Sequence, residues 1–233
     1  MNRKYMVLLG DGMADYPVAE LGGKTPLQAA KTPNLDRLSR RGRLGLVRTI
    51  PPGLPPGSDV ANLSIFGYDP TLHFTGRAPL EAAAMGVKLG PDDVAFRCNL
   101  LTLSGQEEKA FMDDFSAGHI STPEARQIIA DVEKSLGSPE FNFYPGVSYR
   151  HLLVWRRGGR SLSLITTPPH DITGKPIAEY LPRGEGQEEI CGLMEEAQKI
   201  LQHHPINRER QKSGEKPANA IWLWGQGKTP SLL

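Results

Sequence analysis

The most constraining feature of this sequence is a short apolar run near its start that ends in a carboxylate between two glycines. Residues 5–9 read Tyr-Met-Val-Leu-Leu, and Gly10, Asp11 and Gly12 follow them. Such a run is too short for a globular helix and is typical of a strand buried on both faces of a parallel sheet. Ligands bind outside the carboxyl ends of such strands, so Asp11 is a candidate metal or substrate ligand. An Asx-type turn residue is the alternative for Asp11.

Composition indicates an ordinary globular protein without a bulk charge signal. Of 233 residues, 39% are hydrophobic and 23% are charged, and 27 Lys and Arg stand against 26 Asp and Glu. This balance gives no reason to expect nucleic acid or an anionic membrane as a partner, so any anion site must be built locally. No apolar run approaches the ~18 residues of a spanning helix, and no signal-peptide pattern opens the chain. Cys98 and Cys191 are expected to be buried free thiols, which favours a cytoplasmic location.

Proline and glycine divide the first part of the chain into predicted elements. The Thr-Pro pairs at 25–26 and 32–33 each supply a hydroxyl N-cap and a proline at the first helical position. Gly42 is expected to end the second helix, and residues 44–50 are a second strand candidate. A loop rich in proline and glycine, at 51–57, then leads to a helix with Ser58 predicted at its N-cap.

Ser58 has two interpretations. A serine N-cap is common, and capping alone would explain it. A hydroxyl at a helix N-terminus also lies beside free amides and the positive end of the helix dipole, which suits it to carry a phosphoryl group. A nucleophilic serine needs an activating base or metal ion. No Gly-x-Ser-x-Gly elbow and no Ser-His-Asp order is present, so a metal ion shared with Asp11 is the simpler route.

Eight motifs carry a resemblance that runs along the whole chain. They are LGDGMAD at 9–15, GSDVANL at 57–63, TGRAPLEA at 75–82, FRCNL at 96–100, AGHI at 117–120, GVSYRH at 146–151, PPHD at 168–171 and IWLWGQG at 221–227. In content and order they resemble the archaeal-type, cofactor-independent phosphoglycerate mutases of the alkaline phosphatase superfamily.

The resemblance implies an isomerase of glycolysis and gluconeogenesis that interconverts 3-phosphoglycerate and 2-phosphoglycerate. It implies two divalent metal ions, usually manganese, with magnesium, cobalt and zinc as other candidates. Asp11 would be a metal ligand, and Ser58 would be both a ligand and the nucleophile that holds the phosphate as phosphoserine while the glycerate reorients. It also implies an α/β fold, here a partial alkaline-phosphatase-like, doubly wound sheet with an inserted small α+β domain.

A change of pattern near residue 91 matches such an insertion. Strand-like runs, one capped helix and a turn between two further strands suggest a small α+β unit, which we assign to residues 91–177. Residues 1–90 and 178–233 would form the incomplete phosphatase-like domain. The elements expected are strands at 95–103, 109–115, 149–155 and 161–166, a helix from the cap at 121–124 to Gly137, a helix at 188–203, a charged, solvated connection at 207–216 and a last buried strand at 220–224.

Six side chains are predicted to bind the phosphate and carboxylate of the substrate. Arginine forks and histidine are economical donors to such anions, and each candidate falls at a strand or turn edge. Each also has a structural alternative: a surface strand position for an arginine, a turn or packing position for a histidine, and an Asx turn for the aspartate. The six are Arg97, His119, Arg150, His151, His170 and Asp171.

The sequence departs from the family where further metal ligands would be needed. No aspartate follows Asp171 and no histidine follows His204. Two metal ions need more ligands than Asp11 and Ser58 supply. We therefore expect an N-terminal portion of the enzyme, with an incomplete metal site and little or no mutase activity alone. Self-association or the missing C-terminal half would cover its exposed sheet edge.

Two other classes of function stay open. One is a related phosphotransferase, such as a proposed homoserine kinase, which would need a nucleotide site. The sequence at 225–229, Gly-Gln-Gly-Lys-Thr, ends like a phosphate-binding loop, but Trp222 replaces the first glycine that such a loop requires. The other is a non-catalytic binding or regulatory protein built from half of an enzyme.

Overall fold

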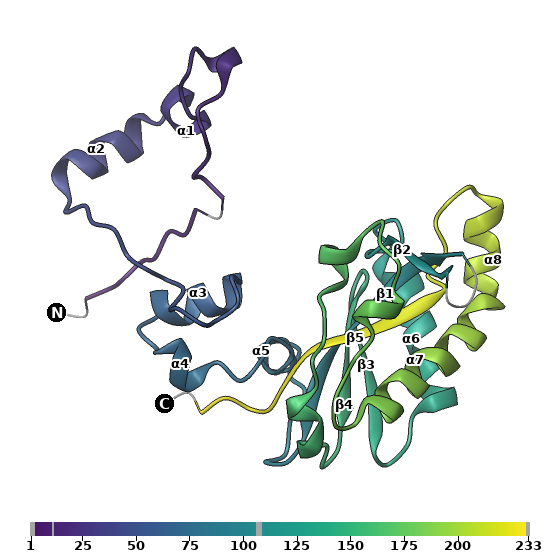
Figure 1. The fold of residues 1–233 in the computed structure, drawn as a ribbon. Coiled ribbons are helices and arrows are strands. Elements are labelled where there is room, and N and C mark those ends of the chain that lie inside the picture. The colour runs from purple at the N-terminus through teal and green to yellow at the C-terminus, as the bar shows by residue number, and fades with distance from the viewer. Residues whose placement is uncertain (1–2, 11, 106–108, 232–233) are drawn as a thin grey trace. The chain divides into compact units, whose positions relative to one another are not determined.

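The structure is a computed structural model that describes residues 3–10, 12–105 and 109–231. It divides into two compact units, Met1–Arg48 and Thr49–Leu233, whose elements are labelled in Figure 1. In the described residues, no helix is both long and apolar enough to cross a membrane.

Short helices make up the regular structure of the Met1–Arg48 unit. The first α-helix begins as predicted, with Thr25 and Gln28 forming a capping box in which each side chain accepts from the other residue's backbone N–H. The second ends at Gly42, whose N–H donates to the carbonyl of Leu38 over 2.8 Å. The described elements are η1 (Ala19–Leu21), α1 (Pro26–Ala29) and α2 (Pro33–Arg41).

The strand predicted at residues 5–9 is wrong for this structure. Those residues form no strand, and their side chains are exposed, from 53% at Leu9 to 92% at Met6. The predicted strand at 44–50 is also absent. A strand buried in a parallel sheet needs hydrogen-bonded neighbours and covering helices. None of the described strands pairs with either run, so the apolar pattern lacks the partners that would bury it.

An antiparallel sheet forms the centre of the Thr49–Leu233 unit. Its long strand β1 (Val94–Ser104) pairs with β4 (Arg150–Trp155) along one edge and with β5 (Ala220–Gly227) along the other. Strand β3 (Phe141–Val147) extends the sheet beyond β4, and β2 (Phe111–Asp114) pairs with the end of β1. The fold is α/β, as predicted. The five-stranded sheet is antiparallel, however, and the described residues form no doubly wound parallel sheet.

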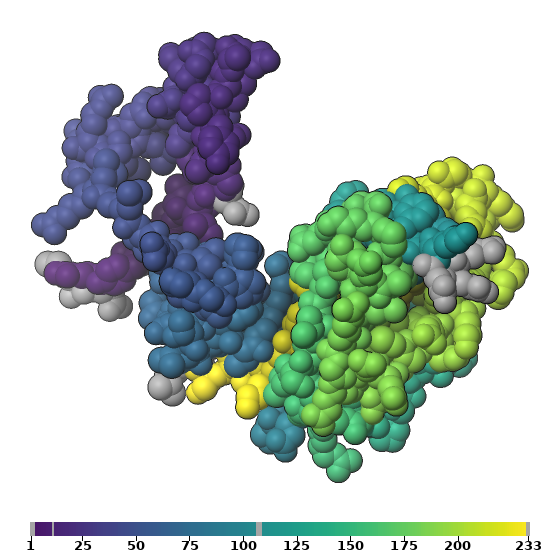
Figure 2. All heavy atoms as spheres, viewed as in Figure 1, coloured from purple at the N-terminus to yellow at the C-terminus, as the bar shows by residue number. Residues whose placement is uncertain are grey.

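Helices cover both faces of this sheet (Figure 1). On one face, α6 (Thr122–Leu136) and α7 (Gln187–Gln202) pack against the even-numbered side chains of β1, such as Phe96 and Leu100. On the other face, α5 (Ala78–Ala84) packs through its alanines against Ala95 and Leu152. From β1 to β5 the atoms form a closely packed body (Figure 2).

Shorter elements connect these layers. They are α3 (Ser58–Ile65), α4 (Pro70–His73), η3 (Gly159–Ser163), η4 (Pro169–Ile172), η5 (Ala178–Tyr180) and α8 (Pro205–Lys212). The boundaries proposed at residues 91 and 177 stay a prediction. In this structure β5, from the C-terminal side of that division, pairs with β1.

Predictions that rested on local signals are confirmed in this unit. Helix α6 has the expected capping box between Ser121 and Glu124 and ends at Gly137. Strands β4 and β5 and helix α7 lie within two or three residues of their predicted ranges.

Two further predictions fail, and one strand was missed. Residues 161–166 form no strand, since η3 occupies 159–163 and the Ser161 hydroxyl donates to the Gly158 carbonyl. Strand β3 was not predicted, because Pro145 and Gly146 interrupt its pattern, and the structure accommodates them with a bulge. The connection at 207–216 is largely the helix α8, in which Asn207 is buried.

Candidate active site

Ser58 is the first residue of α3 and borders a hollow in the surface. The N-cap is Gly57, in extended backbone, so the N-cap predicted at Ser58 is wrong by one residue. Ser58 is exposed, and the hollow has a volume of about 340 Å³. One amide of the first helical turn, that of Val60, already donates to the Asp59 carboxylate over 3.1 Å. The polar residues that line the hollow are Ser58, Asp59, Asn62, Arg77 and Glu81.

Arg97 is a buried cation on the α5 face of the sheet. It lies in the middle of β1, between Leu152 and Trp224 of the neighbouring strands, and is only 4% exposed. Its guanidinium carbon lies 4.6 Å from the centre of the Trp224 ring. Burial lowers the pKa of Arg97 to about 10, although the Glu81 carboxylate acts against this shift. Arg97 therefore stays charged at neutral pH and is poorly solvated, as in sites that bind anions.

Glu81 connects Arg97 to the hollow beside Ser58. One of its carboxylate oxygens lies 3.1 Å from Arg97 Nε and the other 3.5 Å from Arg77 Nε. Arg77 and Glu81 stand four residues apart, on one face of the first turns of α5, and both also line the Ser58 hollow. The candidate nucleophile and the buried cation are thus neighbours of the same ion-pair cluster.

A row of aromatic rings extends from Arg97 to three other predicted substrate-binding residues. The His170 ring meets Trp224 edge to face, with centroids 5.6 Å apart, and meets Phe115 at 6.1 Å. Phe115 in turn contacts Tyr149 at 5.7 Å, and the His119 ring lies 6.1 Å from Tyr149. Each ring thus contacts the next one along the row.

Arg150 adds a second guanidinium to this row. Its guanidinium carbon lies 5.8 Å from the centre of the Tyr149 ring. The Asn99 side chain fixes the middle of the row, because its carbonyl oxygen accepts from Trp224 Nε1 over 3.1 Å and its amide donates to the Phe115 carbonyl over 3.3 Å. Asp171 is exposed beside this row, and its carboxylate lies 3.6 Å from the His170 ring.

Backbone geometry positions the two histidines. Residues 117–119 all have positive φ angles, and His119, with φ of 54°, ends this left-handed turn. Its N–H donates to the Ser116 hydroxyl over 3.1 Å. On the other side, the Thr167 carbonyl accepts from Trp222 Nε1 over 2.8 Å, which ties the segment before His170 to β5. A bond within its own turn thus positions the backbone of His119, and a bond to β5 positions the segment before His170.

A family model described as 2,3-bisphosphoglycerate-independent phosphoglycerate mutase matches residues 39–207. The chain belongs to this family. It is 58% identical to a Geobacter sulfurreducens protein named as a probable 2,3-bisphosphoglycerate-independent phosphoglycerate mutase, over 98% of this chain and 57% of the relative. It is 55% identical to the Methanosarcina acetivorans mutase of that name, over 98% of this chain and 56% of the relative. The chain thus spans just over half the length of these relatives.

Solved structures give the same grouping. The cofactor-independent phosphoglycerate mutase from Thermoplasma acidophilum is 31% identical, with a TM-score of 0.57 over 95% of this chain and 58% of that chain. A solved Pyrococcus horikoshii protein is 32% identical, with a TM-score of 0.66 over 95% of this chain and 50% of that chain.

Sequence reasoning within this phosphoglycerate mutase family missed several residues of the cluster. Arg77 and Glu81 lie in the TGRAPLEA motif but were not assigned a role. Their spacing of four residues, which places side chains on one face of a helix, was the available signal. Trp224 was assigned only to a buried strand. Its position beside Arg97 depends on the pairing of β5 with β1, across more than a hundred residues of sequence, which no local pattern reveals.

His151 is the predicted substrate-binding residue that the structure does not bring to the cluster. It pairs with Cys98 and is buried, whereas Arg97 and Arg150, its neighbours in the two strands, point to the opposite face. Its Nδ1 accepts from the Gly146 N–H over 2.9 Å, and among the described residues its Nε2 has no hydrogen-bond partner. Burial lowers the pKa of His151 to about 3. These contacts describe a neutral ring that holds the β3 bulge.

Because His151 is neutral when folded, His151→Asn is expected to reduce the acid sensitivity of the fold. Below its usual pKa of 6.5, the unfolded chain binds a proton on His151 that the folded chain does not, so stability falls as the pH falls from 6.5 towards 3. At pH 5 the buried His151 is expected to lower the free energy of unfolding by about 2 kcal/mol. Urea unfolding between pH 5 and 8 would measure it. The exposed His203 gives the control His203→Asn, and equal pH dependence in all three proteins would contradict the assignment.

The residues described here do not assemble a metal site. They contain no cluster of three or more His, Cys, Asp or Glu side chains that could hold an ion. Asp11, the predicted metal ligand, lies outside the described residues. Near Ser58, the acidic side chains that line the hollow are Asp59 and Glu81, and Glu81 is paired with arginines. The residues at hand therefore do not fit two divalent metal ions by themselves.

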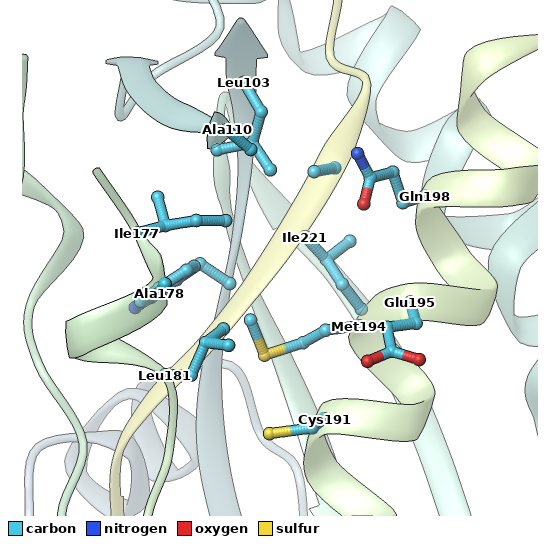
Figure 3. Close-up of a pocket in the computed structure, with 12 residues that line it drawn as sticks. Leu103, Ala110, Ile177, Ala178, Leu181, Cys191, Met194, Glu195, Gln198 and Ile221 are labelled. Atoms are coloured by element: carbon cyan, nitrogen blue, oxygen red, sulfur yellow. The ribbon is translucent and has the colours of Figure 1, made fainter. Parts of the chain in front are cut away.

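A second hollow, of about 430 Å³, lies along β5 between α7 and the segment at 177–181 (Figure 3). Its lining is mainly aliphatic, and Glu195 and Gln198 are its polar side chains. The half-buried Cys191 also lines it. This hollow offers no cation to a phosphorylated acid, so the Arg97 cluster is the better candidate for the active site.

Proposed function

We propose that this chain supplies the phosphoryl-carrying serine and the substrate-binding cations of an enzyme that interconverts 3-phosphoglycerate and 2-phosphoglycerate. The observation that carries the proposal is that the hollow at Ser58 and the ion-pair cluster of Arg97 have residues in common. The hollow at Ser58 is lined by Arg77 and Glu81, which contact each other, and Glu81 also contacts the buried Arg97. A phosphoryl acceptor therefore adjoins a group of guanidinium donors that suits a phosphorylated acid.

In this proposal Ser58 accepts and returns the phosphoryl group. Its Oγ attacks the phosphorus of 3-phosphoglycerate, so that the Oγ–P bond forms as the bond from phosphorus to the 3-oxygen breaks. The glycerate then reorients, and its 2-hydroxyl oxygen attacks the phosphorus of phosphoserine, so that the bond from phosphorus to Ser58 Oγ breaks and 2-phosphoglycerate is released. In each transfer the oxygen that leaves takes up the proton that the attacking hydroxyl loses. Arg97, Arg150, His119 and His170 would hold the anionic and hydroxyl groups during this turn, and Asp171 would orient His170.

The aromatic row gives the reorienting glycerate a suitable boundary. The rings of Trp224, His170, Phe115 and Tyr149 contact one another in turn between Arg97 and Arg150. Cations at the two ends could hold a carboxylate in either orientation, while the apolar faces between them make no competing hydrogen bonds.

Two divalent metal ions, manganese by the family resemblance, stay part of this proposal. They would lower the pKa of the attacking hydroxyl and neutralise charge on the transferred phosphoryl group. Asp11 and Ser58 are the proposed ligands from this chain, and the remaining ligands would have to come from outside the described residues. The alkaline-phosphatase-like, doubly wound sheet and its domain of residues 1–90 and 178–233 belong to the same proposal.

The length shared with the relatives suggests the test. We expect this chain alone to show little or no mutase activity. A chimera in which it replaces the matching 57% of the Geobacter sulfurreducens relative is expected to convert 3-phosphoglycerate to 2-phosphoglycerate with added manganese. Activity of the short chain would overturn the expected incomplete site, and silence of a folded chimera would overturn the proposed reaction. The exposed runs at 5–9 and 44–50 would be covered in the chimera or by self-association.

A further inference from the structure

Arg97 carries an unmet hydrogen-bonding capacity that its surroundings do not explain. Its Nε is buried and forms no hydrogen bond within the described chain, although Glu81 Oε2 lies at 3.1 Å. A charge-assisted hydrogen bond would be aligned and nearer 2.7–2.9 Å. Buried polar groups are nearly always paired, and one left unpaired often marks the place of an absent ion or ligand.

Glu81 neutralises the positive charge of this cluster only in part. Its contact with Arg77 Nε is longer still, at 3.5 Å, and its side chain is 29% exposed. One carboxylate thus stands against the guanidinium groups of Arg77 and Arg97, and Arg150 is also close enough to act on the Arg97 charge. The cluster therefore keeps a net positive charge in a poorly solvated place, which favours an incoming anion.

We propose that Glu81 is a displaceable counter-ion, and that the phosphoryl group of the substrate takes its place between Arg77 and Arg97. Trp224 fixes the site, because its ring covers the Arg97 guanidinium at 4.6 Å and also lies 5.9 Å from that of Arg77. Gly225 follows Trp224 with a φ of +63°, which favours glycine, and a Cβ there would make only ordinary contacts, 3.5 Å from the Arg77 Cβ and 3.8 Å from Arg97 Cγ.

The position of Arg77 indicates which group of the substrate binds there. Arg77 and Glu81 line the hollow that Ser58 borders, whereas Arg150 lies at the far end of the aromatic row. The pair is thus on the side where a phosphoryl group would be transferred. This assignment rests on the proposed function, but the anion site itself can be tested without turnover.

The test is a titration of the chain with inorganic phosphate, in which calorimetry measures the binding. Glu81→Gln is expected to tighten phosphate binding on the order of ten-fold at low salt, because it removes the competing charge. Arg77→Met is expected to weaken it at least about ten-fold. A purely structural ion pair predicts the opposite sign for Glu81→Gln, so unchanged or weaker binding in that variant would overturn the proposal. Unchanged binding in Arg77→Met would overturn it too.

The chain offers a matched control in another ion pair over an indole. Arg160 pairs with Glu189 and lies 5.1 Å from the centre of the Trp155 ring. Glu189→Gln is therefore expected to leave phosphate binding unchanged. A similar gain in that variant would show that the Glu81 effect is one of bulk charge and would overturn the site.

Glycerate tests which group of the substrate binds there, because it carries the carboxylate but no phosphoryl group. It is expected to bind more weakly than phosphate, and tighter binding would overturn the assignment to the phosphoryl group. Normal phosphate binding with an inactive chimera would instead reject the mutase reaction and leave this site standing.

Discussion

Ser58→Ala in the chimera is expected to lower the conversion of 3-phosphoglycerate by about a thousand-fold or more. Ser58 is the hydroxyl that opens into the hollow lined by Arg77 and Glu81, and alanine there leaves no oxygen to carry the phosphoryl group. Without Ser58 the phosphoryl group would have to pass directly between two hydroxyls of one glycerate. That transfer would need both oxygens in line with the phosphorus, so it is not expected to replace the serine. A coupled assay of 2-phosphoglycerate formation would measure the loss. The peptide that contains residue 58 should be found phosphorylated in the unaltered chimera and not in the Ser58→Ala variant.

Helix α3 supplies the control for this experiment. Ser64 lies six residues further along the same helix, and its hydroxyl donates to the Thr49 carbonyl over 2.7 Å. Ser64→Ala removes the same atom from the same helix, and we expect a loss of only a few-fold, through stability. Comparable losses in the two variants, or an active Ser58→Ala chimera, would show that Ser58 is not the carrier.

The elements that the sequence predicts correctly are those specified by their own residues. Helix α6 has a capping box, an apolar stripe and a terminal glycine, all within its own span. The run at 5–9 has equally clear chemistry, yet it forms no strand. A strand is completed by partners distant in sequence, and a pattern cannot show whether they are present. Strand β3 illustrates the converse, because its pairing with β4 accommodates Pro145 and Gly146.

The candidate site likewise contains residues that the sequence places correctly and one that it does not. Motif resemblance pointed to Arg97, His119, Arg150 and His170, and the structure brings these four to one aromatic row. His151 carries the same chemical signal as its neighbour Arg150. It nevertheless faces the helices α6 and α7, because adjacent residues of a strand point to opposite faces. The face that a residue takes depends on the register of β4 against β1, which a motif does not encode.

Buried polar residues are the hardest to predict, as α8 shows. The segment at 207–216 is rich in charge and looks solvated, but Arg210 is only 5% exposed. Its guanidinium donates to the carbonyls of Lys216 and Ala117, each over 2.9 Å, and pairs with Glu124 at the start of α6. Two of these acceptors lie more than eighty residues away, at Ala117 and Glu124, so composition alone cannot reveal that the arginine is buried.

Arg210→Met is therefore expected to destabilise the fold by about 3–5 kcal/mol, a large fraction of the stability of a typical domain. The substitution leaves the Ala117 carbonyl without this donor and the Glu124 carboxylate without its buried partner. Arg208→Met, at an exposed position of the same helix, should change the free energy of unfolding by less than about 0.5 kcal/mol. Urea unfolding of both variants would measure the difference, and equal stabilities would contradict the structural role.

The same substitution is expected to loosen the turn that carries His119. Residues 117–119 hold left-handed backbone angles, and for Ala117 and His119 that conformation persists only where surrounding contacts impose it. The Arg210 bond to the Ala117 carbonyl is one such contact. Amide exchange at 117–119 should therefore accelerate in Arg210→Met more than exchange in β4, whose ladder to β1 contains no Arg210 contact. Uniform acceleration would show that Arg210 acts on global stability alone and does not position His119.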